Sequence, residues 1–172
     1  MRTVFLDVDT QLDFLYPAGA LYVPGAERIV PAVAALNRHA VARGIPLLST
    51  VDAHAENDAE FRAWPAHCVA GALGQRKPVE TLVGQRLVEK QSVDCFTAPE
   101  LAPLIESLAA DRFVVYGVVT EICVLNAALG LRRFGQPVEI VAEAVKELSA
   151  EAAARVREQF RFVEMSECLR SC

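Results

Sequence analysis

The sequence lacks any apolar run long enough to cross a bilayer, and it lacks a cluster of basic residues. A membrane-spanning helix needs about 20 consecutive apolar residues, whereas charged residues interrupt the apolar runs of this chain. The formal net charge of −5 disfavours nucleic acid as a partner, because phosphate binding depends on lysine and arginine. Asp7 comes too early for the apolar core of a signal peptide. We therefore expect a cytoplasmic protein that binds neither membranes nor nucleic acid.

Paired cysteine motifs and histidines are also scarce. The five cysteines are odd in number and form no Cys-x-x-Cys motif. This usage is typical of free thiols in a reducing compartment rather than of a disulfide framework. Of the three histidines, His54 and His67 lie in one connecting segment. No internal repeat, linker or low-complexity block divides the 172 residues, which predicts one domain over residues 1–172.

Short apolar segments alternate with segments of helical periodicity along the whole chain. The predicted strands cover residues 3–8, 45–51, 86–89, 112–117, 137–142 and 160–165. The predicted helices cover residues 27–43, 98–110, 124–134 and 149–159, the last with Ser149 as its N-cap. This alternation predicts an α/β protein with a three-layer αβα arrangement and a Rossmann-like six-stranded parallel sheet. The connection over 52–84 is unusually long, which points to a functional use.

Residues with chemically reactive side chains follow the predicted strands. In an open parallel sheet, ligands bind outside the carboxyl ends of the strands, so side chains at these ends should meet. Such residues follow four of the predicted strands. They are Asp9 after the first, Asp52 and His54 after the second, Lys90 after the third, and Thr120 and Cys123 after the fourth. The pattern predicts a single site built from four separate strand ends.

Cys123 is the candidate nucleophile of this site. Thr120 is a suitable N-cap, which would place Cys123 in the first turn of the following helix. The positive end of the helix dipole favours a thiolate there, and free backbone N–H groups could receive an oxyanion. Asp9 could exchange protons with the thiol if burial raises its pKa, and Lys90 could steady both charges. The alternative is a buried cysteine that only packs.

The long connection carries a candidate metal site. Asp52 and His54 are followed by Glu60 and His67. Two imidazoles with one or two carboxylates suit zinc, manganese or iron(II), with coordination positions left for water or substrate. The alternative is that both histidines are solvated loop residues.

A second enzyme class competes for the first strand. The order Asp7-Val8-Asp9-Thr10 is similar to the opening motif of haloacid-dehalogenase-type phosphatases, in which Asp7 would be the nucleophile, Asp9 the acid/base and magnesium the cofactor. That class also needs paired acids after a late strand. Here no aspartate follows Asp111, and the glutamates at 139, 143 and 147 have a different spacing.

Taken together, several motifs resemble those of the isochorismatase-like cysteine hydrolases, and within them most of all the nicotinamidases. The motifs are Asp9-Thr10-Gln11-Leu12-Asp13-Phe14, Asp52-x-His54, Trp64-Pro65-Ala66-His67-Cys68, Lys90 and Gly117-Val118-Val119-Thr120-Glu121-Ile122-Cys123-Val124. They span nearly the whole chain. Isochorismatases proper lack the metal set, so its presence favours the nicotinamidase side.

The resemblance implies a role for each matched residue. The catalytic triad would be Asp9, Lys90 and Cys123, and the N–H groups of Val119 and Cys123 would form the oxyanion hole beside a cis Val118–Val119 peptide. One divalent ion, zinc before manganese or iron, would be bound by Asp52, His54 and His67, with Glu60 as a further ligand. Phe14, Trp64 and Val118 would line the substrate pocket.

The resemblance further implies hydrolysis of nicotinamide to nicotinate and ammonia through a thioester on Cys123. The family often assembles as dimers or larger oligomers, so a homo-oligomer is a further expectation. Departures around Val93, Asp94 and Cys95 change the expected pocket wall, and an acid at 94 could favour a different amide. A related hydrolase of carbamoyl or ureido amides, and a partner protein that kept the fold without the activity, remain as alternatives.

Overall fold

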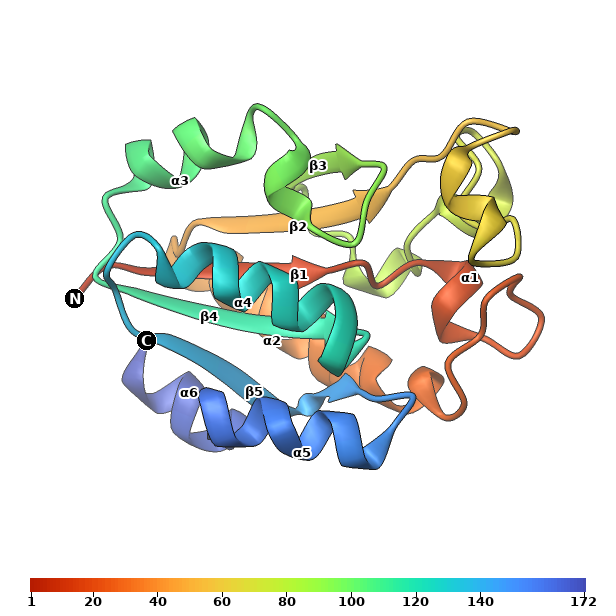
Figure 1. Cartoon of the computed structure of the whole chain (residues 1–172). Coiled ribbons are helices and arrows are strands. Elements are labelled where there is room, and N and C mark those ends of the chain that lie inside the picture. Colours follow the sequence, from red (N-terminus) through yellow and green to blue (C-terminus); the bar gives the residue numbers. More distant parts are fainter.

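A parallel six-stranded sheet forms the centre of the molecule. The computed structural model describes all residues 1–172 (Figure 1). The strand order is β3-β2-β1-β4-β5-β6, and all neighbouring pairs are parallel. The strands are β1 (Thr3–Val8), β2 (Leu47–Asp52), β3 (Arg86–Lys90), β4 (Arg112–Val118), β5 (Val138–Lys146) and β6 (Arg161–Val163). The predicted parallel sheet is confirmed.

Helices cover both faces of this sheet. Figure 1 shows α4 on the near side of the sheet and α2 on the far side, which confirms the three-layer arrangement. The helices are α1 (Leu12–Leu15), α2 (Val30–Arg43), α3 (Leu101–Leu108), α4 (Leu125–Arg132), α5 (Ala150–Gln159) and α6 (Met165–Ser171). None of them is long and apolar enough to cross a membrane.

Local sequence signals explain several of the element ends. Gly44 ends α2 with a φ of 65°, a left-handed conformation that glycine adopts without steric cost. Ser149 is the N-cap of α5, as predicted, because its Oγ accepts a hydrogen bond from the Ala152 N–H at 3.2 Å. Gly117 lies opposite Val8 in the β1–β4 register, and a Cβ there would stand 2.0 Å from the Val8 carbonyl oxygen. Only glycine therefore allows these two strands to approach so closely.

Some predicted boundaries were wrong. The last strand covers only Arg161–Val163, and the residues after it form α6, a helix that the sequence analysis missed. Residues 27–29, at the start of the first predicted helix, belong instead to a 3-10 turn over Ala26–Ile29. Thr120 does not cap the helix that carries Cys123, because its hydroxyl is buried without a partner and Val119 occupies the capping position.

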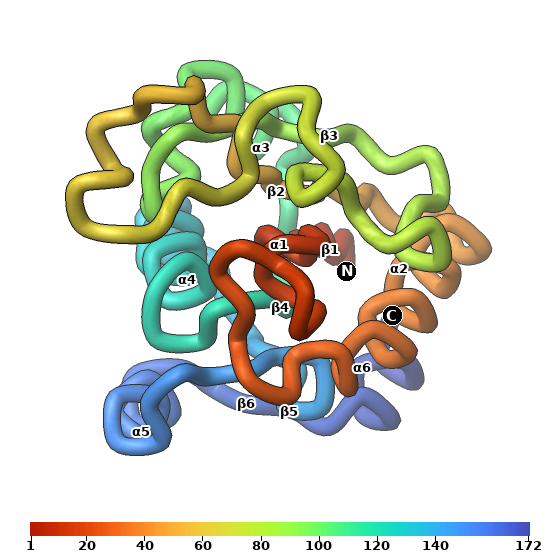
Figure 2. Tube along the Cα trace, turned by 90° about the vertical axis from the view of Figure 1, so that its right-hand side faces the viewer, coloured from red at the N-terminus to blue at the C-terminus, as the bar shows by residue number.

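The topology brings the carboxyl ends of the strands together. β1 lies between β2 and β4, so the residues after these three strands are neighbours in space. Figure 2 looks onto this edge and shows the segment after β1 and the long connection after β2 side by side. Asp9 follows β1 directly and has a φ of 51°, so the extended conformation of the strand ends at this residue.

Candidate active site

Asp9, Lys90 and Cys123 meet at the carboxyl edge of the sheet. Lys90 Nζ lies 2.8 Å from Asp9 Oδ2 and 4.0 Å from Cys123 Sγ. Thr50 donates a hydrogen bond of 2.6 Å to the other oxygen of Asp9. The side chains of Asp9 and Lys90 are fully buried, and Cys123 lines a pocket. The structure thus brings together the three side chains that the sequence placed at separate strand ends.

Burial decides the protonation of the two groups that would exchange a proton. Burial raises the pKa of Asp9, although the charge of Lys90 opposes this shift. Burial also raises the pKa of Cys123 well above its ordinary value, against the same lysine. This shift favours the thiol form of Cys123, opposite to the effect expected from the helix dipole. A neighbouring base that removes this proton would prepare the sulfur for attack.

The turn that carries Cys123 presents backbone N–H groups. Residues Thr120–Val124 form a π-helical turn before α4, and the Val118–Val119 peptide is cis, as the resemblance implied. The N–H groups of Ile122 and Val124 both donate to the Val119 carbonyl, at 3.0 and 3.1 Å. The Val119 N–H itself has no acceptor in the protein, so it is available to a developing oxyanion.

Asp52, His54 and His67 form a buried group that fits a divalent metal ion. One ligand atom from each lies within 4.8 Å of the other two. Nδ1 of His54 lies 3.1 Å from an oxygen of Asp58, and Nδ1 of His67 lies 2.7 Å from the Pro65 carbonyl. These acceptors fix Nδ1 as the protonated nitrogen and leave both Nε2 lone pairs free.

The Nε2 atoms point to one common place. Each lies 3.7 Å from Asp52 Oδ2, and Nε2 of His54 is buried with no hydrogen-bond partner. A buried polar atom without a partner is costly, and a metal ion would satisfy it. Glu60 does not belong to this group but lines the pocket beside it.

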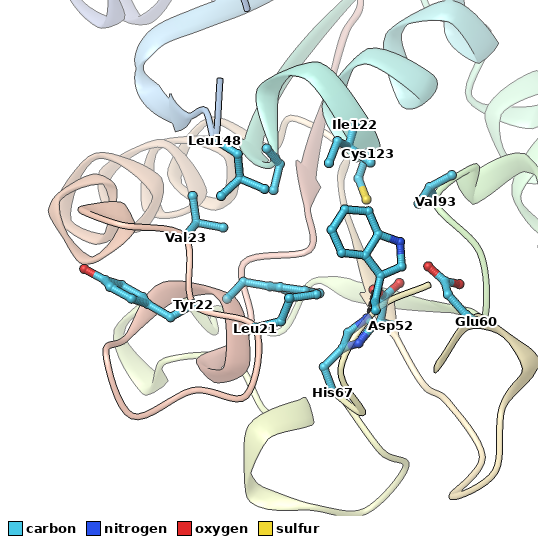
Figure 3. Close-up of a pocket in the computed structure, with 13 residues that line it drawn as sticks. Leu21, Tyr22, Val23, Asp52, Glu60, His67, Val93, Ile122, Cys123 and Leu148 are labelled. Atoms are coloured by element: carbon cyan, nitrogen blue, oxygen red, sulfur yellow. Dashed lines mark ion pairs between the residues drawn. The ribbon is translucent and has the colours of Figure 1, made fainter. Parts of the chain in front are cut away.

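A mostly apolar pocket connects the thiol with the metal ligands. Figure 3 shows Cys123 and Ile122 at one end of this pocket and Asp52 and His67 at the other. The lining residues are Phe14, Leu21, Tyr22, Val23, Asp52, Glu60, Trp64, His67, Val93, Val119, Ile122, Cys123 and Leu148. Phe14 and Trp64 were expected there, whereas Leu21, Tyr22, Val23 and Leu148 come from loops whose course the sequence did not reveal.

Three residues near the pocket differ from expectation. Val118 is not among the lining residues, because its side chain lies in the hydrophobic core and the next residue, Val119, faces the pocket. Asp94 is turned away and accepts a hydrogen bond from the Phe96 N–H at 2.9 Å. Cys95 is buried in the core. Of the three departures noted after Lys90, only Val93 reaches the pocket.

Asp7 is unsuited to act as a nucleophile. It is fully buried, and one of its oxygens accepts hydrogen bonds from Lys77 at 2.9 Å, Asn37 at 2.9 Å and Ser49 at 3.1 Å. Thr10 donates to the other oxygen at 2.7 Å. With its acceptor sites occupied and no contact with a pocket, Asp7 gives no support to the phosphatase interpretation.

Residues after β1 also form hydrogen bonds with the connection that carries the candidate metal ligands. The side-chain amide of Gln11 donates to the carbonyls of Asp52 and Gln75, both at 2.8 Å, and accepts from the Asp52 N–H at 2.7 Å. Asp13 accepts a hydrogen bond from the Cys68 N–H at 2.7 Å, next to His67. These contacts explain why the Gln11 and Asp13 positions belong to the motif. Sequence reasoning had given them no role.

The site residues and a match over nearly the whole chain identify the family of this protein. The fold and the site define a hydrolase with a cysteine, an aspartate and a lysine at the carboxyl edge of a parallel sheet. The isochorismatase domain model matches residues 3–167, and the chain belongs to the isochorismatase family. It is an isochorismatase-family hydrolase with a buried group of side chains suited to a divalent metal.

Solved structures with the same fold include several amidases. The pyrazinamidase of Pyrococcus horikoshii in complex with zinc is 29% identical, with a TM-score of 0.88 over 95% of this chain and 99% of that one. PnC1 of L. infantum in complex with nicotinate is 26% identical, with a TM-score of 0.86 over 96% and 93%. The N-carbamoylsarcosine amidase of Thermoplasma acidophilum is 22% identical, with a TM-score of 0.84 over 96% and 97%. No curated protein matches the sequence.

Proposed function

We propose that this protein is a metal-containing cysteine amidase that hydrolyses nicotinamide to nicotinate and ammonia. The observation that carries the proposal is that one apolar pocket is lined both by Cys123 and by the metal-site residues Asp52 and His67. A flat heteroaromatic amide suits such a pocket, since aromatic and aliphatic walls bind the ring and few polar groups orient it. The similarity to a zinc-containing pyrazinamidase and to a nicotinate complex supports the same substrate class.

The side chains would act in the following order. Asp9 accepts the thiol proton of Cys123, and the sulfur attacks the amide carbon. The oxyanion that forms is stabilised by the N–H groups of Val119 and Cys123. Asp9 then gives the proton to the leaving ammonia, which breaks the C–N bond and leaves a thioester. Water, deprotonated by Asp9, attacks the thioester, and the proton returns to the sulfur as nicotinate leaves.

Lys90 would stabilise the negative charges that arise on Cys123 and Asp9 during this reaction. It forms an ion pair with Asp9 and also contacts Asp52, so it joins the triad to the metal ligands. Burial opposes its charge, but the neighbouring Asp9, Cys123 and Asp52 raise the pKa of Lys90 well above its ordinary value. Lys90 therefore stays protonated and stabilises negative charge on the sulfur or on Asp9.

The residues Asp52, His54 and His67 would hold the metal ion, for which we propose zinc. When bound, the ion supplies a Lewis acid that a ring nitrogen of the substrate can coordinate. Two imidazoles and one carboxylate with open positions are a common catalytic zinc set.

Substrates that carry a carboxylate fit the pocket less well. No lysine or arginine lines it, and Asp52 and Glu60 give it negative charge. A carbamoyl or ureido substrate with its own carboxylate would find no cationic side chain there, and its carboxylate would compete for the proposed metal ion, the position that a ring nitrogen of nicotinamide would take. We therefore place nicotinamide ahead of such amides.

The central experiment measures ammonia release from nicotinamide and from a carboxylate-bearing carbamoyl amide. We expect turnover of nicotinamide, and no turnover by Cys123→Ala, with unchanged circular dichroism. Cys95→Ala removes a buried thiol outside the pocket and serves as the matched control that keeps activity. Turnover of the carbamoyl amide alone would overturn the substrate, and an active Cys123→Ala variant would overturn the mechanism.

The metal site is tested by elemental analysis of the purified protein. We expect about one zinc ion per chain, and loss of this ion in His54→Ala. His39→Ala, in α2 and outside the site, is the matched control that keeps the ion. Retention of the full metal content by His54→Ala would contradict the ligand assignment.

A further inference from the structure

A second group of reactive side chains lies at the opposite edge of the sheet. Arg112 is the first residue of β4 and lies opposite Thr3 in the register. Helix α6 packs against β5 and brings Cys168 and Cys172 to this edge. In Figure 1 the two chain ends lie on one side of the molecule, and the segments that form the pocket lie on the other. The group is therefore remote from the proposed active site.

A buried guanidinium contacts one of these thiols directly. Arg112 Nη2 lies 2.6 Å from Cys172 Sγ, and its side chain is only 8% exposed. The one carboxylate that Arg112 contacts is Glu139, at 3.3 Å, and Glu139 is shared with Arg161 at 2.8 Å. A buried cation requires compensating negative charge, and a thiolate on Cys172 would supply it.

The second thiol is positioned to take part. Cys168 precedes Cys172 by four residues, a spacing that places two side chains on one face of a helix. Cys168 is buried, whereas Cys172 is partly exposed. Residues four positions apart on a helix have Cβ atoms about 5–6 Å apart. A disulfide needs a Cβ–Cβ distance of about 3.5–4.5 Å, so a local shift of the backbone at Cys172 would bring the two sulfurs to bonding distance.

The electrostatics of this thiol differ from those of the other cysteines. The hydrogen bond with Cys168, followed by the charge of Arg112, lowers the pKa of Cys172 to about 6, although burial opposes the shift. In contrast, burial raises the pKa of Cys95 to about 12 and also raises that of Cys68. Thiolates, not thiols, react with peroxides.

We propose that Cys172 and Cys168 form a redox-reactive thiol pair, which a hydroperoxide oxidises to an intrachain disulfide. The Cys172 thiolate attacks one oxygen of hydrogen peroxide, the O–O bond breaks, and the released hydroxide takes up a proton to form water. The product is a sulfenic acid on Cys172. Cys168 then attacks this sulfur, forms the S–S bond and displaces a second molecule of water. Overall, two thiols lose two electrons and two protons to the peroxide.

The proposal is tested by mass spectrometry of the folded protein after graded exposure to hydrogen peroxide. We expect a loss of two hydrogens per chain and a cross-link between Cys168 and Cys172 before any other cysteine is modified. Cys168→Ser should accumulate a sulfenic acid on Cys172 that dimedone traps, and Cys172→Ser should form neither product. Arg112→Lys keeps a cation and should slow the first step less than Arg112→Met does.

Two controls make the result decisive. Thermal unfolding of each variant shows that the fold is retained, and the Cys95→Ala variant should give the same cross-link as the unmodified chain. Oxidation of Cys172 at the same rate as Cys68 and Cys95, or an absent cross-link at full oxidation of Cys172, would overturn the proposal.

Discussion

The two edges of the sheet carry the same three kinds of side chain in different surroundings. At the carboxyl edge, Asp9, Lys90 and Cys123 form an acid, a cation and a thiol. At the amino edge, Glu139, Arg112 and Cys172 do the same. The difference lies in the distance between cation and sulfur, which is 4.0 Å for Lys90 and 2.6 Å for Arg112, and in the fuller burial of Cys123.

This difference teaches that a neighbouring cation alone does not ionise a thiol. Lys90 is shared between Asp9 and Asp52, so little of its charge is left to offset the burial of Cys123. Arg112 contacts Cys172 directly, and the pKa of this thiol falls. In the proposed reaction, the thiol at the carboxyl edge would therefore need a base for each turnover, whereas a pKa of about 6 favours the thiolate of Cys172 at the amino edge.

The largest expected effect comes from removing that base. Asp9→Asn keeps the shape of the side chain and its hydrogen bond with Thr50 but cannot accept the thiol proton. We expect kcat/KM for ammonia release to fall by about 10²–10⁴-fold. Glu139→Gln is the matched change at the amino edge and should leave kcat/KM unchanged. Comparable losses in both variants would show that the two edges are not functionally distinct.

The second prediction concerns stability and compares the loss of two buried cations. Lys77→Met would leave Asp7 as a fully buried carboxylate without a cation, and such a loss costs about 3–5 kcal/mol of unfolding free energy. Arg112→Met leaves Glu139 paired with Arg161, so its cost should be smaller. Urea unfolding of both variants measures the difference. An equal cost in both would mean that the second cation beside Glu139, Arg161, does not reduce the penalty.

The smallest expected effect concerns the pH dependence of alkylation. A pKa of about 6 lies below the ordinary value for cysteine, so Cys172 should react with iodoacetamide as a thiolate at pH 7 and lose reactivity as the pH falls through about 6. Cys123, with its raised pKa, should gain reactivity only in alkaline solution. Peptide mass spectra over a pH series give both profiles. A Cys172 profile centred near pH 9 would contradict the contrast.

The sequence could predict the parallel sheet and the candidate site because both depend on strand ends. The apolar segments showed where β1, β2, β3 and β4 end, and the parallel topology then placed Asp9, Asp52, Lys90 and Cys123 at one edge. The protonation of Cys123 was beyond this reasoning, since a helix dipole can be read from sequence but the degree of burial cannot.

Other features depend on contacts between distant residues. Arg112 and Cys172 are 60 positions apart, and no local pattern indicates that they touch. The pocket residue Leu148 likewise comes from a connection far from Phe14 and Trp64. Helix α6 was missed because its seven residues are too few for a clear helical period.

The left-handed backbone of Asp9 has a consequence for engineering. A residue other than glycine at φ 51° is disfavoured by about 1 kcal/mol, and asparagine tolerates this conformation well. The position therefore holds a carboxylate that suits the proposed chemistry better than it suits the fold. In a library selected for heat resistance alone, we expect asparagine to be the first replacement at this position, because it keeps the backbone conformation and the Thr50 hydrogen bond and leaves Lys90 paired with Asp52, while the proposed proton exchange is lost.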